Sequence, residues 1–368
     1  MIYDYLIVGA GLFGATLANE LTDVGYKVLV VEKQPYVGGA CYTENKDGIT
    51  VHKYGAHIFR TEHRSIWEYV NRYVEFKPFV NSPLAYVDGT LYNLPFNMNT
   101  YKQLWGVLKP IRAKEMIQAD IVPCDNPQNL EEYALSEVGK TIYYKFIKGY
   151  TEKQWGKKCT KLPATILGRL PLRFTYDNNY YANKPYQGIP VKGYTYLIEK
   201  LLDGADVNVN IEDWHRYEFL AKNVVYTGSI DEFYDYKYGK LEYRSLNFME
   251  FEYGIDSMYG NAVINFPESL VPYTRQIEHK FFLDEKSDRT IVSIETPCEY
   301  DGTNERYYPI ETDNNLELYR KYADIETDVI FAGRLGSYKY TDMEQTIINA
   351  RDLAFRIKGA RYEQKKYR

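Results

Sequence analysis

The fold is decided by residues 5–32, YLIVGAGLFGATLANELTDVGYKVLVVE. A short apolar run ends in the glycine-rich turn GAGLFG (9–14), and a helical apolar pattern and a second apolar run follow, ending at Glu32. Gly9 suits a tight turn, Gly11 lets a pyrophosphate approach the backbone, and Gly14 lets the helix pack closely on the strand. An acid 18 residues after Gly14 is placed to accept hydrogen bonds from a ribose. These features predict a dinucleotide-binding Rossmann unit with the pyrophosphate at the helix N-terminus.

The residues after Glu32 indicate which dinucleotide is bound. Lys33 follows the acid, and Gly38, Gly39 and Ala40 lie in the run KQPYVGGA. Two adjacent glycines let a backbone loop lie against a cofactor. The run resembles the FAD-binding oxidase group more than the NAD dehydrogenases, with an ordinary Gly-Gly turn as the alternative. We therefore predict FAD as the cofactor.

Composition limits the classes of function. A chain of 368 residues suggests two or three domains, and 45% hydrophobic and 26% charged residues are typical of a globular protein. The formal net charge of −5 offers no basic footprint for nucleic acid. No run approaches the roughly 20 apolar residues that cross a bilayer. The four cysteines form neither a metal-binding spacing nor a disulfide framework, so we expect no metal and a reducing cytoplasmic location.

The rest of the chain divides into stretches of different periodicity. Residues 62–160 have mainly helical spacing, residues 240–310 alternate like strands, and apolar runs near 207–228 and 328–332 suggest returns to the nucleotide-binding unit. We predict an α/β fold in which an FAD-binding Rossmann-like domain carries an inserted helical domain and an antiparallel β-sheet domain. The predicted domains are 1–80, 190–235 and 325–368 for FAD binding, 81–165 for a mainly helical substrate or lid domain, and 166–189 with 236–324 for the antiparallel sheet domain.

Many short motifs along the whole chain resemble the bacterial UDP-galactopyranose mutases. In chain order they include GAGLFGA, EKQPYVGG, HKYGAHIF, NSPLAY, NLPFNMNT, KGYTEKQWG, DNNYY, YQGIPVKGYT, YTGSID, LEYRSL, NAVINF and YYP. The resemblance implies interconversion of UDP-galactopyranose and UDP-galactofuranose. In that family N5 of the reduced flavin attacks the anomeric carbon and displaces UDP, and the reaction causes no net redox change. It also implies a UDP-sugar as the substrate and, because that family often forms dimers, a homodimer.

The resemblance carries a set of flavin contacts onto this sequence. Arg334 in AGRL would favour the anionic reduced flavin, His57 in HKYGAHIF would lie against it, and Asp342 would combine a flavin contact with a helix N-cap. The full set of expected cofactor contacts is Gly9, Gly11, Phe13, Gly14, Glu32, Lys33, Gly38, Gly39, Ala40, His57, Ile58, Arg334, Thr341, Asp342 and Met343.

The same resemblance implies the substrate site. Arg169 and Arg275 would clamp the diphosphate, which gains negative charge as the bond to the sugar breaks. Phe146 and Tyr150 are four residues apart and would share a helix face, for which a buried aromatic stripe is the alternative. The expected substrate contacts are Asn81, Phe146, Tyr150, Thr151, Trp155, Arg169, Tyr180, Asn265, Arg275, Tyr308 and Tyr340, and Tyr307 could exchange with Tyr308.

Arg60 departs from the family pattern. After HIF the galactose enzymes usually carry a second His, whereas this chain has Arg60, which we place with Arg169, Arg275 and His57 among the catalytic candidates. A longer, permanently charged donor beside the sugar would reach a C2 acetamido group, so UDP-N-acetylgalactosamine is a further candidate substrate. The alternative is that Arg60 only pairs with Glu62 or Asp342. Two other functions also stay open: an amine-oxidase-like FAD oxidoreductase and a non-catalytic nucleotide-sugar binder.

Overall fold

The computed structural model describes residues 2–167 and 172–366, with side chains through residue 359. A parallel five-stranded sheet forms the nucleotide-binding unit. Its strands in spatial order are β10 (Asp206–Asn208), β2 (Val28–Val31), β1 (Tyr3–Val8), β11 (Ala221–Tyr226) and β17 (Ile330–Phe331). The pairing confirms that the chain returns to this sheet near residues 207, 221 and 330. The domain boundaries themselves stay a prediction.

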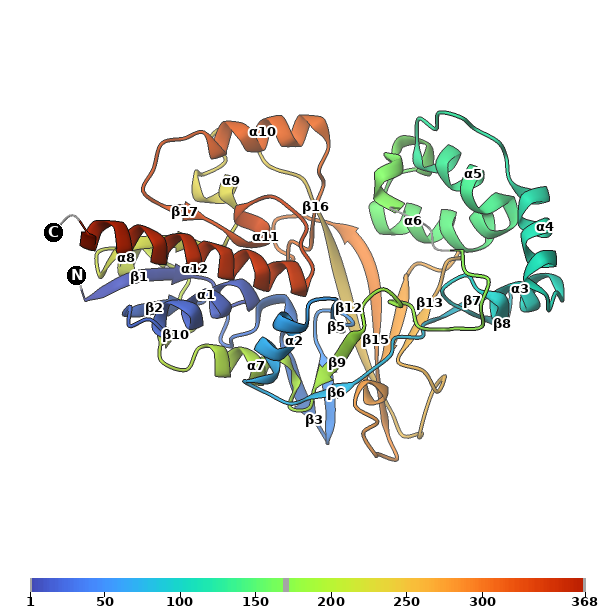
Figure 1. Cartoon of the computed structure of the whole chain (residues 1–368), viewed down its shortest axis with the longest axis horizontal. Coiled ribbons are helices and arrows are strands. Elements are labelled where there is room, and N and C mark those ends of the chain that lie inside the picture. The colour runs from blue at the N-terminus through green and yellow to red at the C-terminus, as the bar shows by residue number, and fades with distance from the viewer. Residues whose placement is uncertain (1, 168–171, 367–368) are drawn as a thin grey trace.

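Helices cover this sheet, and they bury the apolar face of the helix that follows the glycine-rich turn. α1 (Leu12–Thr22) contacts both α7 (Gly193–Leu201) and the long α12 (Met343–Lys366), which lies beside it in Figure 1. Leu17 and Leu21 of α1 are fully buried, so the helical pattern after the glycine-rich turn is the face that packs. The smaller helices are α2 (Arg64–Asn71), α8 (His215–Glu218), α9 (Ile230–Phe233), α10 (Asp313–Ala323) and α11 (Gly333–Gly336).

A mostly antiparallel seven-stranded sheet forms the middle of the molecule (Figure 1). In spatial order its strands are β16 (Tyr308–Pro309), β12 (Tyr243–Tyr253), β15 (Thr290–Glu299), β14 (Arg275–Glu278), β13 (Val263–Asn265), β7 (Leu84–Val87) and β8 (Thr90–Asn93). The strands predicted within 240–310 are confirmed. The helical prediction for 62–160 is wrong for β7 and β8, because four-residue strands are too short to show a clear period.

Two small sheets link the two large ones. β9 (Tyr186–Pro190) pairs with β5 (Phe59–Thr61) and β6 (Phe76–Pro78), and β3 (Thr43–Lys46) pairs with β4 (Ile49–His52). Because β9 joins strands from residues 59–78, it does not belong to the seven-stranded sheet in which the prediction for 166–189 placed it. This pairing places Arg60 of β5 directly opposite Gln187 of β9.

The helical unit lies at the far end of the seven-stranded sheet (Figure 1). Its helices are α3 (Met98–Trp105), α4 (Pro110–Asp120), α5 (Leu130–Ile142) and α6 (Lys148–Trp155). Residues Tyr143–Ile147 between α5 and α6 form a π-helical turn. Phe146 and Tyr150 therefore do not lie on one continuous α-helix, since the wider turn changes the side-chain spacing. Short 3₁₀ turns are η1 (Gly39–Cys41), η3 (Cys159–Lys161), η4 (Ala164–Leu167) and η5 (His279–Phe282).

No helix among residues 2–167 and 172–366 is long and apolar enough to cross a membrane.

Candidate active site

In the glycine-rich turn the fold requires glycine at positions 9 and 14 but not at position 11. A Cβ on Gly9, whose φ is +110°, would overlap the Thr227 hydroxyl, and a Cβ on Gly14 would overlap the Gly9 carbonyl. A Cβ on Gly11 would meet only Gly39 Cα, at 3.9 Å. The protein therefore needs no glycine at position 11, and the space there lies at the N-terminus of α1, where free N–H groups favour an anion. This space fits the pyrophosphate of a dinucleotide.

The Glu32 carboxylate ties the second glycine-containing loop to the first. It is 7% exposed; Oε2 accepts a hydrogen bond from the Ala10 amide at 2.8 Å, and Oε1 accepts one from the Gln34 amide at 3.0 Å. The Gly38 amide donates to the Ala10 carbonyl at 3.0 Å, and Gly38 adopts a φ of +130°. The predicted loop of residues 33–40 thus lies against the glycine-rich turn.

Arg334 fixes the end of the cofactor region near α12. Its Nη2 donates to the Thr341 carbonyl at 2.8 Å and its Nη1 to the Tyr307 carbonyl at 3.1 Å. The guanidinium lies 4.9 Å from the centre of the Tyr340 ring. Two backbone carbonyls and an aromatic face hold the cation without neutralising its charge.

Asp342 has the N-cap role expected from the sequence. Its Oδ1 accepts a hydrogen bond from the Gln345 amide at 2.9 Å, in the first turn of α12. Its Oδ2 lies 3.4 Å from Nη2 of Arg60. One carboxylate therefore caps a helix and pairs with Arg60.

The other predicted cofactor residues differ in their exposure. Phe13 and Ile58 are buried, Met343 is half-buried, and Ala40 is exposed. Lys33 is also exposed and pairs with Glu305 at 3.5 Å.

His57 is a neutral histidine with a defined tautomer. Its Nδ1 lies 2.8 Å from the Gly55 carbonyl, which only accepts, so Nδ1 carries the proton and Nε2 a lone pair. Burial lowers the pKa of His57 to about 4, and the Arg334 and Arg275 charges act in the same direction. Near neutral pH this imidazole can accept a hydrogen bond or a proton at Nε2 but cannot deliver one as an imidazolium.

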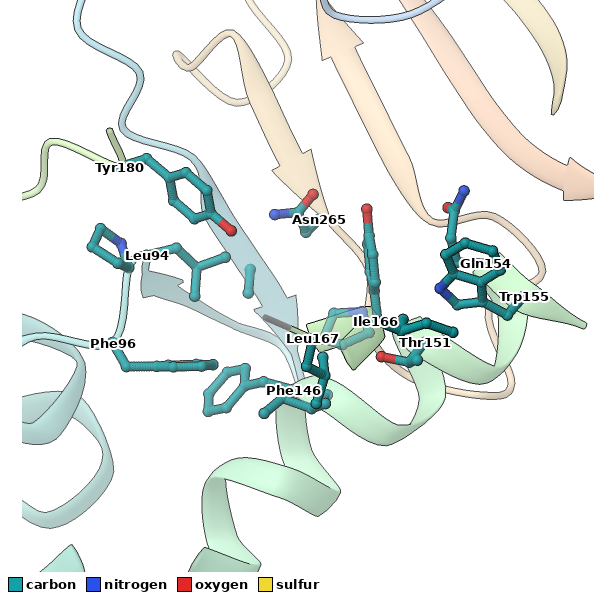
Figure 2. A pocket seen from close by; sticks show the side chains of 15 residues that line it. Leu94, Phe96, Phe146, Thr151, Gln154, Trp155, Ile166, Leu167, Tyr180 and Asn265 are labelled. Carbon is teal, nitrogen blue, oxygen red and sulfur yellow. The ribbon is translucent and has the colours of Figure 1, made fainter. Parts of the chain in front are cut away.

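A cavity of about 320 Å³ lies where α6, β13 and the strand β7 meet (Figure 2). Six of the predicted substrate residues line it: Phe146, Tyr150, Thr151, Trp155, Tyr180 and Asn265. Its apolar wall is formed by Ala85, Leu94, Pro95, Phe96, Ile147, Ile166, Leu167 and Pro267. In Figure 2 the Tyr180 hydroxyl points towards Asn265, away from Phe96 and Phe146. The cavity has an apolar end, which suits a planar base, and a polar end.

The aromatic residues of this cavity are held by other rings. Phe146 is 6% exposed, with Tyr92 at 5.1 Å and Phe96 at 5.5 Å between ring centres. Trp155 lies 6.5 Å from Tyr308. Phe146 therefore packs in a buried aromatic cluster and also lines the cavity, while its contact with the substrate stays a prediction.

Arg275 lies beside the polar end, opposite Asn265 in the β13–β14 pair. Nε and Nη2 of Arg275 both bind Oε1 of the fully buried Glu295, at 2.9 and 2.7 Å. Burial alone would lower the pKa of Arg275, but the Glu295 carboxylate more than offsets it, so the guanidinium stays cationic. Burial raises the pKa of both Tyr150 and Tyr308, although the Arg275 charge opposes this. The two phenols stay protonated and able to donate.

The structure separates Tyr308 from Tyr307. Tyr308 lies 5.6 Å from Tyr340 and interacts electrostatically with Arg275. Tyr307 is 6% exposed, and its ring packs on Phe248 at 6.0 Å. Of the two, Tyr308 is the one beside the cation.

Arg60 makes one of the two ion pairs named as alternatives. Its guanidinium lies over the Tyr181 ring at 4.1 Å and pairs with Asp342, whereas Glu62 pairs with Lys184 at 3.0 Å. The bond to Asp342 uses one of the five N–H donors of Arg60, and no other acceptor for them lies among the described residues.

Among the described residues, four predicted substrate contacts do not line the cavity: Asn81, Arg275, Tyr308 and Tyr340. Asn81 is 6% exposed and contacts the site through its carbonyl, which accepts from the Tyr180 amide at 2.8 Å. Arg169 lies outside the described residues.

Sequence reasoning missed several site residues. Gln154 lines the cavity one residue before Trp155, and its place in KGYTEKQWG was the available signal. Glu295 was hidden in the alternating run TIVSIE, where a buried acid breaks the apolar pattern. Tyr181 and the turn Leu94–Phe96 gave no signal beyond lying in short motifs.

Two family models match the chain. UDP-galactopyranose mutase matches residues 145–340, and an NAD(P)-binding Rossmann-like domain matches residues 7–73. A probable UDP-galactopyranose mutase from Klebsiella pneumoniae is 40% identical, covering 94% of this chain and 92% of its own. A dTDP-fucopyranose mutase from Escherichia coli is 38% identical, covering 95% and 97%. A crystal structure of reduced UDP-galactopyranose mutase has a TM-score of 0.72 at 15% identity, covering 97% of this chain and 96% of its own.

Sequence similarity to oxidases is limited to one part of the chain, although a putrescine oxidase structure shares the fold, with a TM-score of 0.58 at 12% identity over 97% of this chain. An (S)-6-hydroxynicotine oxidase from Paenarthrobacter nicotinovorans is 35% identical over only 20% of this chain. The mutase matches instead extend over nearly all of it, including the cavity and Arg275. The chain therefore belongs to the UDP-galactopyranose mutase family of flavin-dependent isomerases.

Proposed function

We propose that this protein uses reduced FAD to interconvert the pyranose and furanose forms of a nucleotide-linked galactose, with UDP-galactose as its first substrate. One observation carries the proposal: a cavity with an apolar end lies beside a half-buried, permanently charged arginine and neutral tyrosines. An apolar slot suits a pyrimidine base, and a fixed cation with phenol donors suits a diphosphate.

The residues present fit FAD. The open space at Gly11 would take the pyrophosphate, the Glu32 carboxylate would meet the ribose, and Arg334 would lie at the flavin. When bound and reduced, the flavin supplies the nucleophile for the anomeric carbon. His57 would offer Nε2 as an acceptor on the same side of the site.

The chain's own residues would then act on the leaving group. As the bond from the sugar to the diphosphate breaks, negative charge gathers on the phosphate oxygens. Arg275 is held in place by Glu295 before substrate binds, so no side chain needs to reorganise at that moment. Tyr150 and Tyr308 remain neutral donors, and Arg169 is proposed by resemblance as the second cation of the clamp.

Three sugar nucleotides are candidates within this activity. UDP-galactose follows from the family, and UDP-N-acetylgalactosamine follows from the extra donors of Arg60. The E. coli relative adds dTDP-fucose, which has a methylated, 2′-deoxy nucleoside. We also propose a cytoplasmic location and a homodimer.

The test is an assay of the purified protein for bound flavin and for isomerisation. We expect the protein to show flavin absorbance. We also expect it to convert UDP-galactofuranose to UDP-galactopyranose only after reduction with dithionite, as measured by chromatography. The other two sugar nucleotides are assayed in parallel. Equal activity of the enzyme with oxidised flavin, under strictly anaerobic conditions, would contradict the proposal. Reduction of the oxidised flavin by the substrate, as in an oxidase, would also contradict it.

A further inference from the structure

The ammonium group of Lys153 is surrounded by backbone carbonyls. Its Nζ lies 2.6 Å from the carbonyl oxygen of Phe266, 2.9 Å from that of Glu268, 2.8 Å from that of Val271 and 2.8 Å from that of Tyr273. An ammonium has three N–H donors, so three carbonyls can be bonded directly and the fourth is held by the charge. A neutral side chain would leave these four acceptors with no donor in common.

All four carbonyls belong to one loop, and that loop joins two site residues. β13 ends at Asn265 and β14 begins at Arg275, and these two residues are direct partners across the strand pair. The backbone bond from the Phe266 amide to the Thr274 carbonyl, at 2.9 Å, closes the base of the loop. The shape of the loop therefore affects the position of Asn265 and of the Arg275 guanidinium.

Lys153 itself lies on α6, the helix that forms the opposite wall of the cavity. It lies on α6 between Thr151 and Trp155, both of which line the cavity together with Tyr150. Through one side chain, the helix that carries the aromatic wall is joined to the loop that carries the polar wall.

The backbone of α6 packs closely against the loop, with no space for a side chain at Gly149. A Cβ on Gly149 would overlap the Pro267 carbonyl, so the helix backbone touches the loop there. At the other end of α6, Arg244 of β12 donates to the Gln154 carbonyl at 3.0 Å and to the Lys153 carbonyl at 3.2 Å. Gly149 and Arg244 fix the two ends of the helix, and Lys153 fixes its distance from the loop.

We propose that Lys153 is a positioning residue, which sets the aromatic wall of the nucleotide cavity at the correct distance from Asn265 and Arg275. The inference rests on the proposed function, since it concerns binding of the nucleotide diphosphate. Lys153 does not line the cavity and makes no contact with the substrate in this role. It acts through the loop and the helix.

The experiment compares Lys153→Met with Lys148→Met in the full-length, FAD-loaded protein. Methionine keeps the length of the stem and removes the donors. Lys148 lies on the same helix, where it pairs with Glu131 at 3.5 Å and lies 5.4 Å from the centre of the Tyr144 ring, so it is the matched control. Calorimetry with UDP alone, and with dTDP alone, measures affinity without requiring turnover.

We expect Lys153→Met to weaken binding of the nucleotide by about tenfold or more and to raise KM by a similar factor. Its flavin content and flavin spectrum should match those of the wild type, and Lys148→Met should bind the nucleotide normally. A lower melting temperature with unchanged affinity and KM would assign Lys153 a purely structural role and overturn the inference. Wild-type protein that binds neither nucleotide would contradict the proposed function and the inference with it.

Lys153→Arg decides the question if the methionine variant does not fold. A guanidinium keeps the charge, but its planar fork cannot direct its N–H groups to four carbonyls around one point. We expect at least a threefold loss of UDP affinity, with faster amide hydrogen exchange at residues 266–274. Wild-type affinity in this variant would overturn the inference.

Discussion

Arg275 binds Glu295 through two nitrogens and a single oxygen. Nε and Nη2 of the arginine converge on Oε1, at 2.9 and 2.7 Å, and Oε2 of the fully buried glutamate has no hydrogen-bond partner among the described residues. The carboxylate thus fixes the arginine and leaves its Nη1 without a bond to Glu295. Such an arrangement holds a cation ready for an anionic ligand at the cost of a buried carboxylate.

We predict that Arg275→Met affects activity and stability separately. Loss of the cation should lower kcat/KM by about 10² or more, because the leaving diphosphate loses a fixed positive partner. It also leaves Glu295 buried and unpaired, which should cost about 3 to 5 kcal/mol of unfolding free energy. The double variant Arg275→Met/Glu295→Gln should recover much of the stability but none of the activity. Urea unfolding and steady-state kinetics measure the two effects, and activity restored in the double variant would remove Arg275 from the diphosphate site.

Gly11→Ala should leave the fold intact and remove the cofactor. The backbone at Gly11 is extended (φ −77°, ψ −177°), and a Cβ there meets only Gly39 Cα, at 3.9 Å, so the apoprotein tolerates it. The added methyl group would occupy the space that a pyrophosphate needs. We expect a loss of bound flavin with a nearly unchanged circular dichroism spectrum. Gly254→Ala, where a Cβ meets nothing within 4 Å, is the control, and full flavin content in Gly11→Ala would place the cofactor elsewhere.

Acid should destabilise the protein through three histidines whose pKa values are lowered in the folded chain. Burial lowers the pKa of His279 to about 3 and that of His57 to about 4, and it also lowers the pKa of the fully buried His52. Below pH 6.5 these histidines bind protons in the unfolded chain but stay neutral in the folded chain. The contribution of these histidines to the free energy of unfolding is therefore complete above pH 6.5 and is lost as the pH falls towards 4 and 3.

His279→Gln tests this pH dependence. The His279 ring accepts from the His52 amide at 3.2 Å and lies 2.7 Å from the Ser293 hydroxyl, so the variant loses stability at pH 7 but should show a shallower fall in acid. Urea midpoints between pH 7 and pH 4 measure the slope. Exposed His215 provides the control variant His215→Gln, whose slope should match that of the wild type. Equal slopes for all three proteins would show that His279 does not cause the acid sensitivity.

Arg60→His should change which sugar is preferred. Arg60 is held by Asp342 and the Tyr181 ring, and its remaining N–H donors have no partner among the described residues. A donor that matches the acetamido carbonyl at C2 is worth roughly 1–3 kcal/mol, or about 5- to 150-fold in relative kcat/KM. We expect the wild type to accept UDP-N-acetylgalactosamine and the variant to shift towards UDP-galactose. An unchanged ratio of the two kcat/KM values would leave Arg60 as only a partner of Asp342.

Local spacing predicted those parts of the molecule that depend on neighbours in sequence. The strand, glycine-rich turn, helix and acid of residues 5–32 form one unit, so their geometry follows from residue type and separation. The N-cap at Asp342 was predicted for the same reason. The strands β7 and β8 were missed, because four-residue elements have no period to read.

The sequence by itself determined the nucleotide-binding unit and, through its motifs, six of the residues that line the cavity, since each depends on short stretches with their own chemistry. Only the tertiary structure decided how those stretches meet. It paired Arg275 with Glu295, placed Tyr308 and not Tyr307 beside that arginine, and turned Arg60 onto Tyr181 and Asp342. It also put the ammonium of Lys153 among four carbonyls more than a hundred residues away. Such contacts depend on strand register and helix packing, which bring together side chains that no local pattern relates.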